Sequence, residues 1–439
     1  MAFQLDSTYA ANPEKHFDTL QVHAGWAPDP ITGSAALPVY ASAAFQFDDA
    51  PDAAAKFALA KPGNVYGRLT NTTTDAVAAR VAAVEGAAGA VAVASGHAAE
   101  ILAITNIVGA GDHIVASDSL YGGTWNIFLH TLADLGVETT FVENNDIDAF
   151  VAATKSNTKL WYVETIGNPL VDVADVPALV EAANALKEPV PVFVDNTFAT
   201  PYLYRPAEDG AAVVIESLTK WIGGHGATLG GAVVDAGTFD WNKTAGKFPT
   251  LTEPDPSYHG AVFTKAAPAA PFSTRVLANK LRDFGPTLSP YAAQLIGLGL
   301  ETLSLRVQRH SDNALAVATF LKSHPKVSWV RYSGLEDDPS HEVASRILHH
   351  GFGGVVVFGV KGGREAGLKV VDNVKLFTHL ANVGDAKSLI IHPASTTHSQ
   401  LTPDQLKAAH LSEDLVRLSV GIENVDDIIA DLDQALARA

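Results

Sequence analysis

Short apolar stretches that alternate with helical segments are the feature that most limits how this chain can fold. Segments with helical periodicity separate most of these stretches, which are rich in Val, Ile and other strand-forming residues. Seven of them occur between residues 90 and 235, at Ala90–Ser95, His113–Ser117, Glu138–Glu143, Leu160–Thr165, Val190–Asp195, Ala212–Ser217 and Leu229–Asp235. Apolar strands that alternate with helices predict an α/β fold whose mostly parallel sheet is covered by helices on both faces.

The regions on either side of these stretches have different patterns. Residues 1–70 alternate short apolar pieces with Pro, Gly and Asn, which predicts an extended N-terminal arm before a large domain over 71–287. Within that domain, residues 240–271 are rich in Pro, Thr, Asp and Lys and are predicted to be a long loop or insertion. A long helical stretch and further β-rich runs predict a smaller C-terminal α/β domain over 288–439.

Composition and charge exclude several classes of protein. The 439 residues include 48 acidic and 30 basic ones, and a net charge of −18 argues against nucleic acid or an anionic membrane as a general partner. The chain has no Cys, which excludes disulfides, Cys-based zinc sites and a Cys nucleophile. No apolar run approaches a membrane span and the first residues lack a signal-peptide pattern, so we expect a cytoplasmic protein.

Polar residues at the ends of the predicted strands are candidates for a site, because ligands of such sheets gather at the carboxyl ends of the strands. Gly96 and His97 follow the first stretch and open a helix, where free N–H groups suit an anion, although an ordinary strand-to-helix turn has the same pattern. Asp195 ends an apolar stretch, where a carboxylate is costly unless it meets a cation or capping donors. A turn or helix-capping aspartate is the alternative.

The next strand end combines two hydroxyls with a lysine. Ser217 and Thr219 can bind one phosphate, and Lys220 points its amine into the same pocket. A surface lysine is the alternative, which the neighbouring Trp221 and the glycines after it disfavour. A phosphate cradle, an acid and a lysine match the phosphate, the ring nitrogen and the aldehyde of pyridoxal phosphate (PLP).

Seven motifs resemble those of the cystathionine-type, or Cys/Met-metabolism, PLP enzymes of fold type I. They span nearly the whole chain in the family's order. They are "YGRLTN" (Tyr66–Asn71), "SGHAA" (Ser95–Ala99), "YGGT" (Tyr121–Thr124), "ETIGNP" (Glu164–Pro169), "VDNTF" (Val194–Phe198), "SLTKWIGGHG" (Ser217–Gly226) and "VRLSVGIE" (Val416–Glu423). The resemblance implies a fold type I PLP-dependent transferase with a mostly parallel seven-stranded sheet.

The resemblance also implies roles for individual residues in cofactor binding. Lys220 is expected to form the Schiff base with PLP, and Asp195 to pair with the pyridine nitrogen. Tyr121 is expected to stack on the cofactor ring and to assist proton transfer. The phosphate would be held by Ser217, Thr219 and the backbone of Gly96 and His97.

Four further residues receive roles by the same resemblance. Asn168 would contact the cofactor's phenolic oxygen or the substrate carboxylate. Arg417, inside an apolar strand, would clamp the substrate's α-carboxylate, and a buried arginine needs an anion on physical grounds as well. Tyr66 and Arg68 would reach the phosphate of a neighbouring subunit, which implies a homodimer or homotetramer. The alternative is an arginine paired with an acid of its own chain.

Three features resemble the O-acetylhomoserine sulfhydrylase subgroup of the family. They are "ETIGNP", the segment 240–271, and the segment 381–401, in which Asn382 stands where γ-lyases commonly have serine. The subgroup carries out a PLP-dependent γ-replacement that converts O-acetyl-L-homoserine and sulfide to L-homocysteine and acetate in methionine biosynthesis. Asn382 and Tyr66 are then expected to contact the substrate together with Arg417 and Asn168.

Other functions remain as alternatives. A methionine or cystathionine γ-lyase, or a cystathionine γ-synthase, would share most of these motifs. A catalytically silent binding protein would be expected to have lost Lys220, Asp195 or Arg417, and all three are present. A metal hydrolase is suggested by 16 His residues and by His392–His398, but no ligand spacing typical of a metal site occurs. The sequence leaves open the acyl donor, acetyl or succinyl, and the sulfur source.

Overall fold

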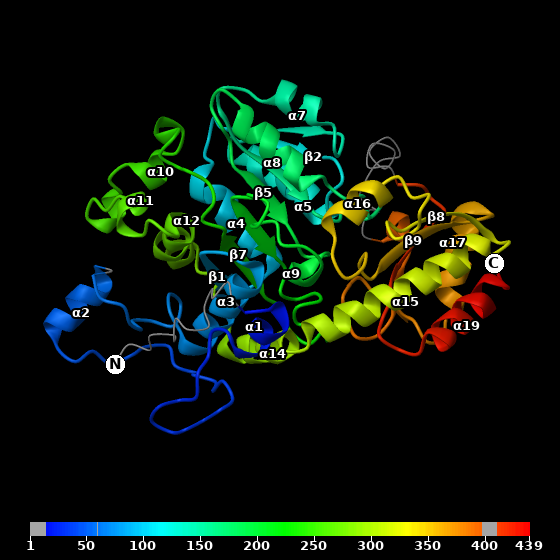
Figure 1. Ribbon diagram of the computed structural model, residues 1–439, viewed down its shortest axis with the longest axis horizontal. Coiled ribbons are helices and arrows are strands. Elements are labelled where there is room, and N and C mark those ends of the chain that lie inside the picture. The colour runs from blue at the N-terminus through cyan, green and yellow to red at the C-terminus, as the bar shows by residue number, and fades with distance from the viewer. Residues whose placement is uncertain (1–14, 59, 397–410) are drawn as a thin grey trace.

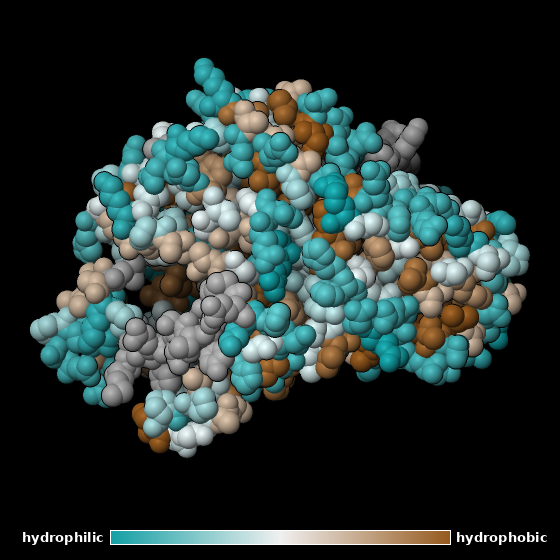
Figure 2. Space-filling model, in the orientation of Figure 1, coloured by the Kyte–Doolittle hydropathy of each residue, from teal (hydrophilic) through white to brown (hydrophobic). Residues whose placement is uncertain are grey.

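The computed structural model describes residues 15–58, 60–396 and 411–439. Residues 1–14 of the predicted arm lie outside these ranges, as do residues 397–401 of the segment 381–401 and His398 of the pair His392–His398. Figure 1 shows a larger body that holds the middle of the chain and a smaller one that ends at the C-terminus. Within the described ranges, no helix combines the length and the apolarity needed to cross a bilayer. Hydrophilic residues cover most of the face seen in Figure 2, and hydrophobic residues form small separate patches.

The large body contains a seven-stranded sheet in the order β1-β7-β6-β5-β4-β2-β3. β7 runs antiparallel to β1 and β6, and the other neighbouring pairs are parallel. The strands are β1 Gly89–Val93, β2 His113–Ser117, β3 Glu138–Val142, β4 Thr158–Glu164, β5 Val192–Asp195, β6 Val213–Glu216 and β7 Gly231–Asp235. Five of them lie within their predicted stretches, whereas β1 begins one residue and β4 two residues before theirs, so the mostly parallel sheet is confirmed.

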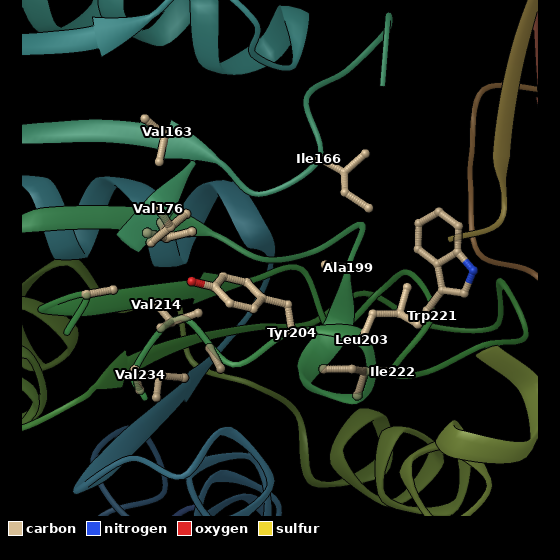
Figure 3. Close-up of a cluster of buried hydrophobic side chains, with 14 of the residues drawn as sticks. Val163, Ile166, Val176, Ala199, Leu203, Tyr204, Val214, Trp221, Ile222 and Val234 are labelled. Carbon is tan, nitrogen blue, oxygen red and sulfur yellow. The ribbon is translucent and has the colours of Figure 1, made fainter. Parts of the chain in front are cut away.

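Alternate residues of these strands fill two hydrophobic cores, one on each face of the sheet. Val163, Val214 and Val234 belong to one core, which Figure 3 shows beside Leu203 of α9 (Thr200–Leu203). Tyr162 and Phe193 belong to the other, as does Val213 in the strand position next to Val214. Because successive side chains of a strand point to opposite faces, a sheet buried on both faces needs apolar residues at nearly every position.

Helices of the large body cover both faces of this sheet (Figure 1). Asn71 caps α3 by accepting a hydrogen bond from the Thr73 N–H, and Gly86 ends it in the left-handed conformation at φ 69°. The longer helices are α3 Thr72–Glu85, α4 Gly96–Ile107 and α8 Val176–Ala185. The shorter ones are α1 Phe17–His23, α2 Ala50–Phe57, α5 Gly122–Asn126, α6 Leu132–Asp134, α7 Ile147–Ala153, α9 Thr200–Leu203 and α13 Arg282–Phe284, with π-helical turns at Ile127–Thr131 and Val276–Leu281.

The smaller body has a five-stranded, mostly antiparallel sheet in the order β10-β11-β12-β9-β8. Its strands are β8 Val327–Arg331, β9 Val355–Val360, β10 Thr378–His379, β11 Leu389–Ile391 and β12 Leu415–Ser419. α14 Pro290–Leu300 leads into this body. The helices of the body itself are α15 Leu303–Ser323, α16 His341–Ile347, α17 Gly363–Asn373 and α19 Val425–Leu436. This arrangement confirms the predicted fold class.

The segment 240–271 differs from its prediction as a long loop. It contains α10 Pro249–Thr252, α11 Phe263–Ala266 and the start of α12 Pro271–Arg275. Trp241 and Phe248 are buried within it, and the ring of Trp241 stacks on Phe272 at 5.4 Å between centroids. The sequence pattern does not predict these helices, because they are short, lie among Pro and Thr residues and show no clear periodicity. Buried aromatic residues anchor them instead.

The turn that follows Lys220 is tied to the long helix α15 by Arg306. The buried guanidinium of Arg306 donates hydrogen bonds to the carbonyl oxygens of Trp221 and Gly299 at 2.6 Å and of Ile222 at 3.3 Å. Gly224 in the same turn has φ 72°, and a Cβ at this position would overlap that guanidinium. The glycine run therefore leaves room for a buried cation whose partners are backbone carbonyl groups.

We predict that Gly224→Ala lowers the free energy of unfolding by about 3 kcal/mol, because it adds a steric overlap with Arg306 to the cost of a positive φ. Gly33 is the matched control, since it has nearly the same φ of 71° but no atom within 4 Å of an added Cβ. Gly33→Ala should cost only about 1 kcal/mol. Urea unfolding followed by circular dichroism measures both, and equal losses would show that crowding at Arg306 is unimportant.

Candidate active site

A pocket of about 220 Å³ lies at the carboxyl edge of the large sheet and is closed on one side by residues of the small body. It brings together ten of the twelve residues predicted from the sequence. They are Gly96, His97, Tyr121, Asn168, Asp195, Ser217, Thr219, Lys220, Asn382 and Arg417. Tyr66 and Arg68 do not line it.

Lys220 lies in the turn after β6 with its amine inside the pocket. Nζ donates a hydrogen bond of 2.5 Å to Oδ1 of Asn382. The pKa of Lys220 is lowered to about 8, mainly by burial and also by the charge of Arg417, while Asp385 and Asp195 oppose the change. Part of the amine is therefore neutral near pH 7.5, and only the neutral form is a nucleophile or a base.

Asp195 ends β5 beside Glu164, the last residue of β4. Its Oδ1 accepts a hydrogen bond of 2.9 Å from the Thr197 N–H, so the predicted turn contact is also present. Burial raises the pKa of Asp195, whereas the hydrogen bonds from Thr197 and the charge of Lys220 lower it. The pocket thus contains a partly buried carboxyl group, and a ligand with a protonated ring nitrogen would stabilise its charged form.

The N-terminus of α4 comes close to Ser217. Ser95 caps this helix by accepting a hydrogen bond of 3.1 Å from the Ala98 N–H. A Cβ on Gly96 would lie 2.8 Å from Cβ of Ser217 and 3.0 Å from its Oγ. Only glycine lets the helix end and the hydroxyl approach this closely, and the free N–H groups there suit an anion.

The hydroxyl of Thr219 has a different environment from the one predicted. It donates to the carbonyl oxygen of Gly230 at 3.1 Å and accepts from the N–H of the same residue at 3.0 Å. Thr219 lines the pocket, but these two hydrogen bonds tie its side chain to the backbone before β7. Its hydroxyl is thus less free for a phosphate than that of Ser217.

Glu164 joins two predicted residues that are far apart in the sequence. Its Oε1 accepts a hydrogen bond of 2.6 Å from the Tyr121 N–H, and its Oε2 accepts one of 3.1 Å from the Asn168 N–H. The side chain of Tyr121 remains 42% exposed, and its ring lies 5.6 Å from that of His97. The carboxyl group of Glu164 therefore fixes the backbone on both sides of the pocket.

Arg417 projects from β12 of the small sheet and is buried. Its Nη1 donates a hydrogen bond of 2.9 Å to Oδ1 of Asn168. Burial lowers its pKa to about 10. Within the ranges that the structure describes, no carboxylate lies at ion-pair distance from Arg417, so this cation faces the pocket with donors available for an anionic ligand.

Tyr66 and Arg68 line a separate cavity of about 740 Å³ together with residues such as Lys56, Tyr258 and Arg282. The guanidinium of Arg68 lies 5.0 Å from the centre of the Tyr66 ring. Its Nε donates to the carbonyl oxygen of Arg282 at 2.9 Å rather than to a carboxylate. The role of both residues at a neighbouring subunit's site stays a prediction.

Two acidic residues of the pocket were not predicted. Glu164 ends an apolar stretch just as Asp195 does, so the rule of polar strand ends would have identified it. Glu100 lies one turn into α4, and burial raises its pKa to about 8, with the charge of Asp195 adding to this effect. No sequence signal marks Glu100, because its approach to the pocket depends on how α4 packs on the sheet.

The sequence pattern that describes the Cys/Met metabolism PLP-dependent enzyme family matches residues 18–437. This chain belongs to that family. A homocysteine synthase from Schizosaccharomyces pombe is 48% identical over 426 residues, which cover 97% of this chain and 99% of the relative. An O-acetyl-L-homoserine sulfhydrylase from Thermus thermophilus is 47% identical over 423 residues, which cover 96% of this chain and 100% of the relative.

A solved structure of the family has nearly the same fold. It is that of a Campylobacter jejuni protein described as an O-acetylhomoserine (thiol)-lyase, and it contains N'-pyridoxyl-lysine-5'-monophosphate. Its TM-score to this chain is 0.92 at 38% sequence identity, over 96% of this chain and 100% of the neighbour. The cofactor of the family is therefore PLP.

The pocket of this chain fits that cofactor. The amine of Lys220 has a pKa lowered by burial, as a covalent anchor requires. The carboxyl group of Asp195 is suited to a ring nitrogen, and the approach of Gly96 to Ser217 leaves a cradle that a Cβ would fill. These residues would hold PLP.

We predict that an amine-reactive reagent such as acetic anhydride labels Lys220 of the cofactor-free protein with a half-maximum near pH 8. The neutral amine is the reactive form, so labelling rises with pH through the pKa, which is about 8 here and near 10.5 for an ordinary lysine. Peptide mass spectrometry measures labelling at each pH. A half-maximum near 10.5 would mean that Lys220 is not held in a buried site.

We predict that Gly96→Ala raises the dissociation constant for PLP at least about tenfold, because the methyl group forces Ser217 away from the helix N-terminus. Gly109→Ala is the matched control, since the nearest atom to an added Cβ there is Oδ2 of Asp112 at 3.9 Å. Absorbance titration with PLP measures both variants. Equal affinity in Gly96→Ala and the parent protein would rule out a phosphate cradle at this position.

Proposed function

We propose that this protein is an O-acetylhomoserine sulfhydrylase that converts O-acetyl-L-homoserine and sulfide to L-homocysteine and acetate in methionine biosynthesis. The observation that carries the proposal is the placement of Lys220 and Arg417 in one pocket, each held by an asparagine side chain. The relatives named above, at 47–48% identity over almost their full lengths, support this activity.

Arg417 and Asn168 are suited to bind the amino-acid part of the substrate. The guanidinium of Arg417 would donate to the α-carboxylate, and the hydrogen bond from its Nη1 to Asn168 fixes its orientation. Glu164 holds the Asn168 backbone in turn. Anchored in this way, the substrate would have its Cα–H bond near the amine of Lys220, which lines the same pocket.

Bound PLP supplies an aldehyde that takes up the substrate's amino group and a ring that withdraws electrons from Cα and Cβ. Lys220, once free, would accept the Cα proton at Nζ, for which a pKa of about 8 is well matched. Asp195 would keep a proton on the ring nitrogen, and Tyr121 would stack on the ring and assist proton transfer. A Cβ proton leaves, the Cγ–O bond breaks to release acetate, sulfide forms the Cγ–S bond, and the protons return.

We also propose that the protein works as a homodimer or homotetramer in the cytoplasm. Tyr66 and Arg68 lie away from the pocket of their own chain, which supports the proposal that they serve a neighbouring subunit's site. In this proposal the chain is divided into an arm over 1–70, a PLP-binding domain over 71–287 and a small domain over 288–439.

We predict the products of the purified protein in three incubations of O-acetyl-L-homoserine, with sulfide, without sulfide, and with cysteine instead. Homocysteine and acetate should form only with sulfide, because Cγ needs an added sulfur nucleophile. Mass spectrometry identifies the products. Cystathionine from the cysteine reaction would indicate a cystathionine γ-synthase, and 2-oxobutanoate with ammonia in all three would indicate a γ-lyase. O-succinyl-L-homoserine in a parallel set tests the acyl group.

A further inference from the structure

The amide of Asn382 lies between Lys220 and a carboxylate outside the pocket lining, that of Asp385. Its Oδ1 accepts the hydrogen bond of 2.5 Å from Nζ of Lys220, and its Nδ2 donates one of 2.7 Å to Oδ1 of Asp385. Asn382 and Asp385 precede β11 of the small sheet, whereas Lys220 follows β6 of the large one. The three side chains form a chain of hydrogen bonds between the two bodies.

The chemistry of the two ends fixes the orientation of this amide. An ionised carboxylate only accepts hydrogen bonds, so the NH₂ group of Asn382 must face Asp385 and its carbonyl oxygen must face Lys220. Both forms of the lysine amine can donate to this oxygen, but the charged ammonium donates the stronger hydrogen bond. An amide held in this way favours the protonated amine over the neutral one.

The backbone around Asp385 is held in place by a closely approaching glycine and by two hydrogen bonds. Gly226 has φ 60°, and a Cβ on it would overlap the carboxylate of Asp385. The N–H of Ala386 donates to the carbonyl oxygen of Gly224 at 2.9 Å, and that of Gly384 donates to Oγ of Ser419 at 2.9 Å. The segment that carries Asp385 is thus fastened both to the turn after Lys220 and to β12.

Several other charges face these groups. Lys220 is also near Arg417, which disfavours its ammonium form, and near Asp195, which favours it; its own charge lowers the pKa of His97. Asp385 is half-buried, and burial raises its pKa, while the hydrogen bond from Asn382 and the charges of Lys220, His225 and Lys387 lower it. Arg417 and burial would together leave the ammonium poorly stabilised without the Asn382–Asp385 pair.

We propose that Asp385 is a positioning residue that orients the amide of Asn382 and thereby holds the amine of Lys220 and stabilises its protonated form. The inference rests on the proposed role of Lys220, whose Nζ would carry a proton after taking it from Cα. Asp385 touches neither substrate nor cofactor in this proposal and acts only through Asn382.

The test measures the pKa of Lys220 by pH-dependent labelling of the full-length, cofactor-free protein. In Asp385→Asn and Asp385→Ala we predict that this pKa falls by about 1, because the charge beyond the amide is removed. Asp372→Asn, which removes an exposed acid at the end of α17, is the matched control and should leave the pKa unchanged. An unchanged pKa in both Asp385 variants, or the same fall in Asp372→Asn, would overturn the proposal.

A double-mutant cycle with Asn382→Ala separates action through the amide from direct action across space. The proposal requires that the fall caused by Asp385→Asn shrinks at least about twofold when Asn382 is already Ala, and additive effects would contradict it. If neither Asp385 variant folds, Asn382→Ala alone decides: a lower pKa of Lys220 supports the proposal, and an unchanged one refutes it. Labelling uses no substrate. If the parent protein forms no homocysteine, the proposed function is therefore refuted, but the result of the labelling experiment still stands.

Discussion

The organisation of this protein around its pocket depends on cationic side chains that are buried or partly buried and have no carboxylate beside them. Within the described ranges, Arg306, Arg417 and Lys220 have no carboxylate at ion-pair distance, and removing an unpaired charge from water is expensive. Arg306 is stabilised by three backbone carbonyl groups, which leaves it a purely structural cation. Arg417 and Lys220 each have one asparagine oxygen instead. These two are thus stabilised in part only, and in the proposed function an anionic or covalent ligand would complete their stabilisation.

The pocket is lined by residues from both sheets and from the segments next to them. The register of β4, β5 and β6 places Glu164 beside Asp195 and the turn of Lys220 beyond them, all at one edge of the large sheet. The small sheet adds Arg417 from β12 and Asn382 from the segment before β11. Figure 1 shows that α15 extends from beside the large body into the small one, and its Arg306 fastens the turn after Lys220. The geometry of the pocket therefore depends on contacts outside it.

The sequence predicted the parts of the site that follow from strand ends, and missed the parts that depend on packing. Asp195, Ser217 and Lys220 end apolar runs, so the sheet alone brings them together. Glu100 and the contact of Asn382 with Asp385 have no such signal, because they depend on how α4 and the two sheets pack. The segment 240–271 is predicted to be a long loop or insertion, and its short helices escape prediction because their aromatic anchors have no regular spacing. The antiparallel direction of β7 could not be predicted from the sequence either, because the composition of a strand does not show in which direction it runs.

The chain supplies the groups of the pocket in a fixed order. Gly96, Asp195 and Lys220 lie in the part that is synthesised first, and Arg417 follows Lys220 by 197 residues. At a translation rate of about 5 to 20 residues per second, the lysine emerges from the ribosome about 10 to 40 s before the arginine. During that interval the nascent chain carries the lysine that is proposed to anchor the cofactor, but it does not yet carry the guanidinium whose charge disfavours the ammonium form of that lysine. Burial, the main cause of the lowered pKa of Lys220, and the charge of Arg417 both require the folded chain, so the amine acquires its pKa of about 8 only after the small body has been synthesised and has packed on the large one.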